Sequence, residues 1–107
     1  MKTITNNEIK CQLALEALKN VIDPEIGLNI VDLGLIYQID FNEQESGIQL
    51  VMTLTTQFCP MGESITEGAK QILEHTFAGS IVEVELSFNP PWNADFLSEA
   101  GKTFLGR

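Results

Sequence analysis

The 107-residue sequence predicts a single α+β domain in which helices cover one face of a small mixed sheet. Segments whose apolar residues recur at helical spacing alternate with segments in which every second residue is apolar. A short polar segment joins two predicted strands as a hairpin, and a helix joins the second strand to the third. The predicted order is therefore α-β-β-α-β-α, a two-layer sandwich with a three-stranded sheet that occupies residues 1–107.

The composition is that of a folded acidic protein. Hydrophobic residues make up 44% and charged residues 20% of the chain, which is ordinary for a globular domain and excludes the disordered class. The net charge of −9 and the lack of any Lys or Arg cluster argue against nucleic acid and anionic membranes as partners. Cys11 and Cys59 match no disulfide framework or zinc motif. With neither a signal peptide nor a membrane span, a cytoplasmic protein with reduced thiols is expected.

The first helix is predicted over residues 5–20, because Thr5 and Glu8 have the spacing of a capping box. Apolar residues recur at helical spacing through this segment and include Cys11, which is therefore expected in the core. The helix is expected to end before Pro24, because the residue that precedes a proline disfavours α geometry.

The segment 23–27 is a constrained loop that carries two carboxylates, Asp23 and Glu25. Two interpretations of this pair are open. In the first, the carboxylates serve turn chemistry, since Asp readily accepts hydrogen bonds from nearby backbone N–H groups. In the second, they approach Cys59 as acid–base groups or as oxygen ligands.

Alternating apolar residues predict three strands. The first covers residues 31–41 and the second residues 48–55, and the polar segment 42–47 joins them as an antiparallel hairpin. The third covers residues 81–88 and is expected to run parallel to the second, because a helix lies between them. A short final helix is predicted over residues 94–104.

The connection from the second strand into the second helix carries Cys59. Pro60 fits the first position of a helix over residues 60–77, which makes Cys59 the expected N-cap. Free N–H groups and the helix dipole would favour the thiolate there and lower the pKa of Cys59. The alternative is a small buried hydrophobic side chain. Three threonines precede the cysteine: Thr53, Thr55 and Thr56.

Two aromatic side chains complete the candidate residues. His75, the only histidine, is expected near the end of the second helix, about 24 Å from Cys59 at the helical rise per residue. A Cys–His dyad within one chain is therefore not expected. Trp92, the only tryptophan, lies in the rigid extended segment 89–93 and either covers a site or closes the core.

Four motifs, in this order, resemble the metal–sulfur-cluster biosynthesis family, which includes SufT-like and PaaD-like bacterial proteins and the eukaryotic MIP-eighteen cytosolic assembly factors. The motifs are Asp23-Pro24-Glu25-Ile26, then Ile30 through Tyr37, then Met52 through Pro60, then Phe88-Asn89-Pro90-Pro91-Trp92. The resemblance covers about residues 8–106. It is specific because the four motifs occur together, whereas no single one would suffice.

The resemblance implies an iron–sulfur cluster assembly or transfer factor, an accessory protein and not an enzyme, that delivers clusters to apoproteins. It implies that Cys59 is the reactive or ligating thiol. It also implies a set of residues that line the same surface: Asp23, Glu25, Thr53, Thr55, Thr56, Pro60 and Trp92. One thiolate cannot complete a four-thiolate shell, so a cluster would bridge a homodimer, borrow ligands from assembly-machinery proteins or a small thiol, or bind transiently.

Two other functions stay open at the level of the sequence. The first is a protein–protein adaptor in a metalloprotein-maturation complex, with Cys59 structural, which includes a PaaD-like role beside a phenylacetate oxygenase. PaaD-like members typically carry further cysteines after the motifs, and the lack of these here favours the SufT-like role. The second is a thiol enzyme with Cys59 as nucleophile, assisted by Asp23 or Glu25.

Overall fold

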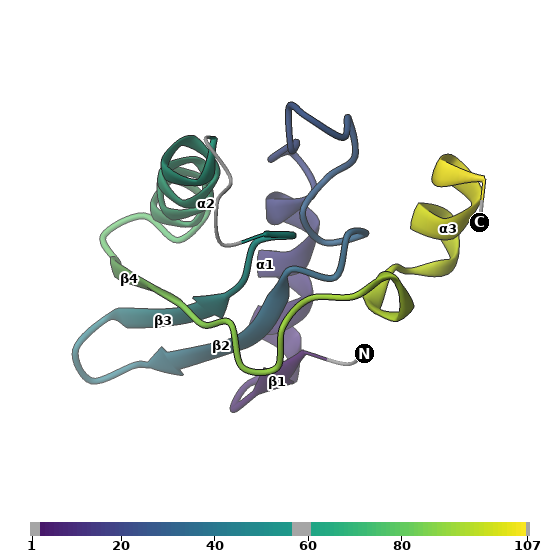
Figure 1. Cartoon of the computed structure of the whole chain (residues 1–107). Coiled ribbons are helices and arrows are strands. Elements are labelled where there is room, and N and C mark those ends of the chain that lie inside the picture. Colours follow the sequence, from purple (N-terminus) through teal and green to yellow (C-terminus); the bar gives the residue numbers. More distant parts are fainter. Residues whose placement is uncertain (1–2, 57–60, 107) are drawn as a thin grey trace.

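The computed structural model describes residues 3–56 and 61–106 (Figure 1). In chain order the elements are β1 (Ile4–Thr5), α1 (Glu8–Leu18), β2 (Ile36–Asn42), β3 (Gly47–Met52), α2 (Gly62–Thr76), β4 (Ile81–Leu86), the 3₁₀ turn η1 (Ala94–Phe96) and α3 (Glu99–Leu105). The predicted order α-β-β-α-β-α is confirmed once β1 and η1 are set aside.

The sheet has four strands in the order β1-β2-β3-β4, and the prediction of three strands was wrong. The missed strand, β1, pairs in parallel with β2 through Ile4 and Thr5. Two residues are too few to show an alternating pattern, so only tertiary pairing defines this strand. The other two pairings agree with the prediction, because β2 and β3 form an antiparallel hairpin and β4 runs parallel to β3.

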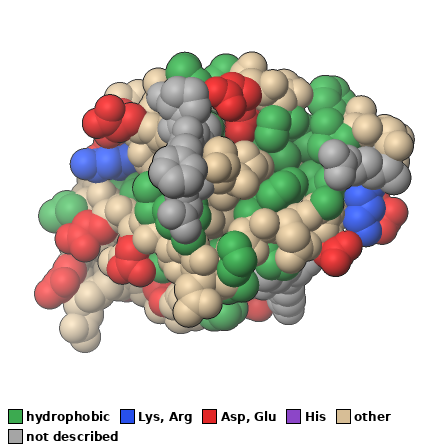
Figure 2. All heavy atoms as spheres, in the orientation of Figure 1, with side chains coloured by type: hydrophobic (Ala, Val, Ile, Leu, Met, Phe, Trp, Pro, Cys, Tyr) green, Lys and Arg blue, Asp and Glu red, His purple; other side chains and the backbone are tan. Residues whose placement is uncertain are grey.

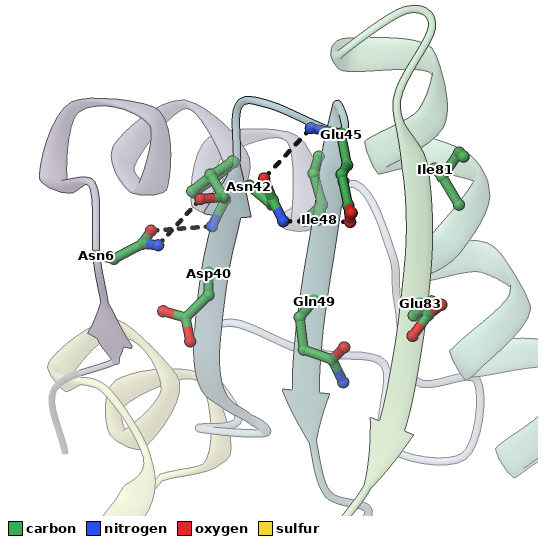
Figure 3. Close-up of a pocket in the computed structure, with 10 residues that line it drawn as sticks. Asn6, Asp40, Asn42, Glu45, Ile48, Gln49, Ile81 and Glu83 are labelled. Carbon is green, nitrogen blue, oxygen red and sulfur yellow. Dashed lines mark hydrogen bonds between the residues drawn. The ribbon is translucent and has the colours of Figure 1, made fainter.

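Helices α1 and α2 lie side by side on one face of the sheet and bury its apolar side chains (Figure 1). Helix α2 contributes Ile65, Ala69 and Leu73 to this core. The opposite face of the sheet carries polar side chains, and no helix of the described ranges covers it (Figure 3). None of the helices in the described ranges combines the length and hydropathy that a bilayer span requires.

Helix α3 does not join the helical layer, which corrects the prediction that the helices share one face of the sheet. It lies to one side (Figure 1) and packs on the loop that precedes β2. A Cβ atom on Gly101 would lie 2.6 Å from the carbonyl oxygen of Asp32 and 3.3 Å from Leu28, so only glycine permits this approach. The helix is short, and its packing partner is a loop that no periodicity could identify.

Several predicted boundaries also move, and among them β3 ends at Met52 instead of residue 55 and α3 begins at Glu99 instead of residue 94. β2 begins at Ile36 instead of residue 31, because the chain turns at Gly34 with φ of +79°. A Cβ atom on Gly34 would lie 2.2 Å from the carbonyl oxygen of Phe96. α1 has Asn7 and not Thr5 as its N-cap, and the Asn7 side chain accepts a hydrogen bond from the Lys10 N–H. β4 ends at Leu86, two residues before the predicted end.

Candidate functional site

The residues that follow β3 lead from the core of the protein to its surface. Thr53 is fully buried, and its backbone N–H donates a hydrogen bond of 2.9 Å to the carbonyl oxygen of Leu35. Thr55 is half-buried and Thr56 is exposed. The chain therefore reaches solvent within three residues, just before the segment that contains Cys59.

The Thr53 side chain belongs to a buried polar group that ties three segments together. The Tyr37 hydroxyl donates a hydrogen bond of 2.7 Å to the carbonyl oxygen of Pro90, and its oxygen also hydrogen-bonds with the Thr53 side chain. Burial raises the pKa of Tyr37, and the hydrogen bond from Thr53 acts weakly in the opposite direction. Tyr37 is therefore a neutral donor that links β2 to the start of the candidate site and to the segment after β4.

The loop 23–27 is built around Asp23, whose side chain is only 2% exposed. Its carboxylate accepts a hydrogen bond of 2.9 Å from the Glu25 N–H, and its carbonyl oxygen accepts one of 2.7 Å from the Gly27 N–H. Gly27 has φ of +83°, which completes the turn. The Asp23 carboxylate thus stabilises its own loop, whereas the Glu25 carboxylate is exposed.

Trp92 is half-buried, and its indole N–H donates a hydrogen bond of 2.6 Å to the carbonyl oxygen of Leu33. Its ring packs against the hydrophobic core. Of the two roles considered for this residue, these contacts describe the closing of the core. They also hold the chain after β4 against the loop before β2.

The structure brings two of the predicted site residues into one network. Thr53 and Trp92 both bond to the stretch between Leu33 and Tyr37, Thr53 at its middle and Trp92 at its start. Among the described residues, the hydrogen bonds of Asp23 stay within its own loop and its neighbour Leu28. The carboxylates and the threonines therefore belong to separate segments that different hydrogen bonds stabilise.

Asp32 is a polar centre that the sequence did not single out as a site residue. One carboxylate oxygen accepts a hydrogen bond of 2.7 Å from the Asn29 amide, and the other accepts one of 2.7 Å from the Ser98 hydroxyl. Burial alone would raise the pKa of Asp32, but these two hydrogen bonds and the charge of Lys19 together lower it. The Asn29-x-x-Asp32 spacing hints at a local turn, but Ser98 lies 66 residues away and no sequence pattern connects it to Asp32.

Cys59 and Pro60 lie outside the described residues. The structure therefore does not test the predictions that Cys59 is the reactive or ligating thiol and that Pro60 lines the site. The helix boundary, however, corrects the argument for the thiol pKa. Helix α2 starts at Gly62 with Met61 at its N-cap position, two residues later than predicted. A helix start at Pro60 capped by Cys59 was therefore wrong, and the N-cap argument no longer supports a lowered pKa of Cys59.

Metal-ligating side chains are sparse in the part of the chain that the structure describes. There, no three His, Cys, Asp or Glu residues come close enough to hold a metal ion. Cys11 is 2% exposed and lies in the core, as predicted from its place on α1. His75 is exposed in the last turn of α2, also as predicted. Neither side chain offers a ligand near the end of β3, so Cys59 is the one cysteine that is left for surface thiol chemistry.

Comparison with known proteins gives consistent relatives. The model of the family described as "Iron-sulfur cluster assembly protein" matches residues 12–86. The Fe-S protein maturation auxiliary factor YitW of Bacillus subtilis is 39% identical over 90 residues, which cover 84% of this chain and 87% of YitW. The Fe-S protein maturation auxiliary factor SufT of Staphylococcus aureus is 41% identical over 87 residues, which cover 80% of this chain and 97% of SufT.

A solved structure extends the likeness to three dimensions. The domain of unknown function DUF59 from Bacillus anthracis superposes with a TM-score of 0.86 at 34% identity and covers 92% of this chain and 93% of its own. The family match begins within α1 and continues to the end of β4. The chain therefore belongs to the iron–sulfur cluster assembly protein family.

Proposed function

We propose that this protein is an auxiliary factor in the maturation of iron–sulfur proteins and that it handles its cargo through the Cys59 thiolate. The observation that carries the proposal is the family match over residues 12–86, together with relatives that bear the name of maturation factors. The relatives are called auxiliary factors, which supports an accessory role and not an enzymatic one.

The donor set supports a carrier with incomplete ligation. Thiolate is the protein ligand that iron–sulfur clusters prefer, and four are usually needed. The chain has two cysteines, and Cys11 is buried in the core. One chain thus offers one thiolate, Cys59, so the remaining ligands come from a second copy, a partner protein or a small thiol. Such a site releases its cargo more readily than a closed four-thiolate site.

We assign the surface beside the Cys59 thiol a role in contacting the cluster or the recipient protein. Two threonines, Thr55 and Thr56, shortly precede Cys59 in the sequence, and Glu25 belongs to the site that the resemblance implies. All three residues are at least partly exposed and would meet the cluster or the recipient protein. Asp23, Thr53 and Trp92 are buried or half-buried and would hold these segments in place. Pro60 would limit the backbone next to the thiol. We place this activity in the cytoplasm, with apo iron–sulfur proteins and assembly proteins as partners.

The proposal is tested by anaerobic reconstitution with iron and sulfide, comparing the wild type with Cys59→Ser. We expect the wild type to take up iron, with visible absorbance and a shift from monomer to dimer. Cys59→Ser should lose both signals. Cys11→Ala is the matched control, because it removes the other thiol from a buried position and should keep the uptake.

An adaptor role predicts a different result. If neither the wild type nor Cys11→Ala binds iron alone, the two functions are distinguished by an experiment in cells. The variants are introduced into cells that lack the gene, and the activity of an iron–sulfur enzyme is measured at equal protein levels. Full activity with Cys59→Ser would contradict the thiolate role and leave the adaptor function.

A further inference from the structure

The outer edge of β4 is an unpaired strand edge in the described part of the protein. β4 is the last strand of the sheet, and its inner edge pairs with β3 along the whole strand. The backbone N–H of Ile81 bonds to Ser46 and that of Ser87 bonds to Met52. Because backbone groups alternate in direction along a strand, the N–H and C=O groups of Val82, Val84 and Leu86 point to the outer edge.

The two faces beside this edge differ in chemistry. On the open face of the sheet, Glu83 and Glu85 are exposed and are neighbours of Gln49 and Val51 on β3 (Figure 3 shows Glu83 and Gln49). Neither glutamate belongs to an ion pair among the residues described, where the pairs are Lys10 with Glu43 and Lys19 with Glu16. The open face of the edge is therefore acidic, with two carboxylates outside the ion pairs of the described residues.

On the helix side, β4 and α2 enclose a groove of about 580 Å³. On its β4 side, Val82 is buried, Val84 is half-buried and Leu86 is 43% exposed. The α2 wall is formed by Thr66, Glu67 and Lys70. The apolar floor of the groove is thus increasingly uncovered toward the end of β4, where an added strand would shield it from water.

A second copy of this chain is a poor occupant of the edge. Two β4 strands related by a two-fold axis would pair antiparallel, and pairing around Val84 would place Glu83 opposite the Glu85 of the other copy. Like charges directly opposite each other destabilise a strand pair. The net charge of −9 on each chain opposes this association further (acidic side chains gather where β4 and the β2–β3 hairpin lie in Figure 2).

We propose that the outer edge of β4 is a docking site for an extended segment of a partner protein in which apolar and basic residues alternate. In antiparallel pairing, Val82, Val84 and Leu86 would exchange backbone hydrogen bonds with the apolar residues, whose side chains would fill the groove beside α2. The basic residues would stand opposite Glu83 and Glu85, in the pairs where side chains are closest. This inference goes beyond the proposed function and does not depend on Cys59.

The first test is amide hydrogen exchange of the full chain, measured by NMR with and without a peptide. The probe is the blocked octapeptide Thr-Lys-Val-Lys-Val-Lys-Val-Thr. In the free protein the amides of Val82, Val84 and Leu86 should exchange at least tenfold faster than those of Glu83 and Glu85, which bond to β3. The peptide should slow the exchange of the three outer amides and leave the inner ones unchanged.

Modified peptides distinguish strand addition from simple charge attraction. N-methylation of the valines removes the N–H groups that would bond to β4 and should abolish binding. N-methylation of the lysines affects N–H groups that would point away from β4 and should preserve it. A peptide with glutamate in place of lysine should bind at least tenfold more weakly.

Charge reversal on the protein gives the matched comparison. Glu83→Lys/Glu85→Lys should weaken binding of the lysine peptide about tenfold and favour the glutamate peptide. Glu16→Lys/Glu99→Lys makes the same change of net charge at exposed positions of α1 and α3, away from the β4 edge, and should change the affinity less than twofold.

Three results would overturn the proposal: slow exchange of the outer amides in the free monomer, equal binding of both N-methylated peptides, or equal loss of affinity in both charge-reversed variants. Dimerisation of the free protein that protects the same three amides would also overturn it, in favour of a second copy. None of these measurements involves iron, so a failed docking site leaves the cluster reconstitution with Cys59 unaffected.

Discussion

At the scale of single residues, the most consequential polar side chains are those that connect distant parts of the chain. The Asp32 carboxylate receives hydrogen bonds from Asn29 and Ser98. The Tyr37 hydroxyl joins Pro90 and Thr53. Each of these groups would be costly to leave unpaired in the interior. They therefore stabilise one arrangement of the loop before β2. The Thr53 N–H bonds to Leu35 at the end of this loop.

Replacing Asp32 with Asn should lower the free energy of unfolding by about 1–2 kcal/mol at pH 7, because one of two charge-assisted hydrogen bonds is lost. The pKa of Asp32 is lowered in the folded protein, so the folded state binds the proton less readily than the unfolded state. Its contribution is present above the unfolded pKa of about 3.9 and is lost as pH falls through the lower folded pKa.

Urea unfolding at pH 7 and at pH 2.5 measures this effect. The difference between wild type and Asp32→Asn should shrink at the lower pH. Glu74→Gln removes one negative charge at an exposed position of α2. Its free energy of unfolding should equal that of the wild type at both pH values. A difference between wild type and Asp32→Asn that is equal at both pH values would contradict a role for the ionised carboxylate.

Thr53→Val separates a supporting role from direct contact with cargo. Thr53 is fully buried and hydrogen-bonds with Tyr37, so the variant should lose about 1 kcal/mol of stability in chemical denaturation. Iron uptake per folded chain should be unchanged. Thr56→Val, at an exposed position, should leave stability nearly unchanged. Lost uptake in a fully folded Thr53→Val protein would mean that this hydroxyl meets the cargo.

At the scale of elements, the C-terminal part of the chain acts as a clasp on the loop before β2. We use clasp for the segment 92–101, which contacts residues 28–34 through four features. They are the Trp92 hydrogen bond to Leu33, the Phe96 approach to Gly34, the Ser98 hydrogen bond to Asp32 and the Gly101 approach to Asp32. The clasp lies after residue 86, beyond the family match, and contributes no strand to the sheet.

Gly34→Ala should open this clasp. Gly34 combines a φ of +79° with a backbone contact that leaves no room for a Cβ atom. We expect a loss of about 2–4 kcal/mol, from left-handed strain and from displacement of Phe96. Gly79→Ala is the control, because Gly79 has φ of +86° but open space around its Cα, and it should cost only the strain of about 1 kcal/mol.

Thermal and urea denaturation of the two variants give the comparison, and Trp92 fluorescence reports the clasp directly. Gly34→Ala should shift the emission of the folded protein toward that of exposed tryptophan, whereas Gly79→Ala should not. Equal destabilisation by both substitutions, with unchanged fluorescence, would show that the close approach of Phe96 adds nothing to the conformational strain.

At the scale of the whole molecule, the net charge is −9, and the described residues form few compensating ion pairs. Mutual repulsion of the carboxylates lowers the stability of the folded state. Added NaCl screens this repulsion, so the unfolding midpoint should rise by a few degrees between 0.02 and about 0.3 M salt. Glu83→Gln/Glu85→Gln removes two neighbouring charges of β4 and should reduce this rise. A midpoint independent of salt would show that the charges are too far apart to matter.

Local periodicity was enough to predict several parts of this protein from the amino-acid sequence. The alternation through β3 and β4, the polar hairpin and the apolar stripes of α1 and α2 are short-range patterns. They predicted the order of the main elements, the antiparallel and parallel pairings and the burial of Cys11. The four motifs, read together, identified the family.

Other features depend on partners far away in the chain and became visible in the folded protein alone. β1 exists because Ile4 and Thr5 meet β2, and α3 leaves the helical layer because Gly101 fits against Asp32. Asp32 becomes a polar centre only when Ser98 reaches it. Such contacts have no period and no fixed spacing, since they arise from how packed segments approach one another in space, and a local pattern cannot encode them.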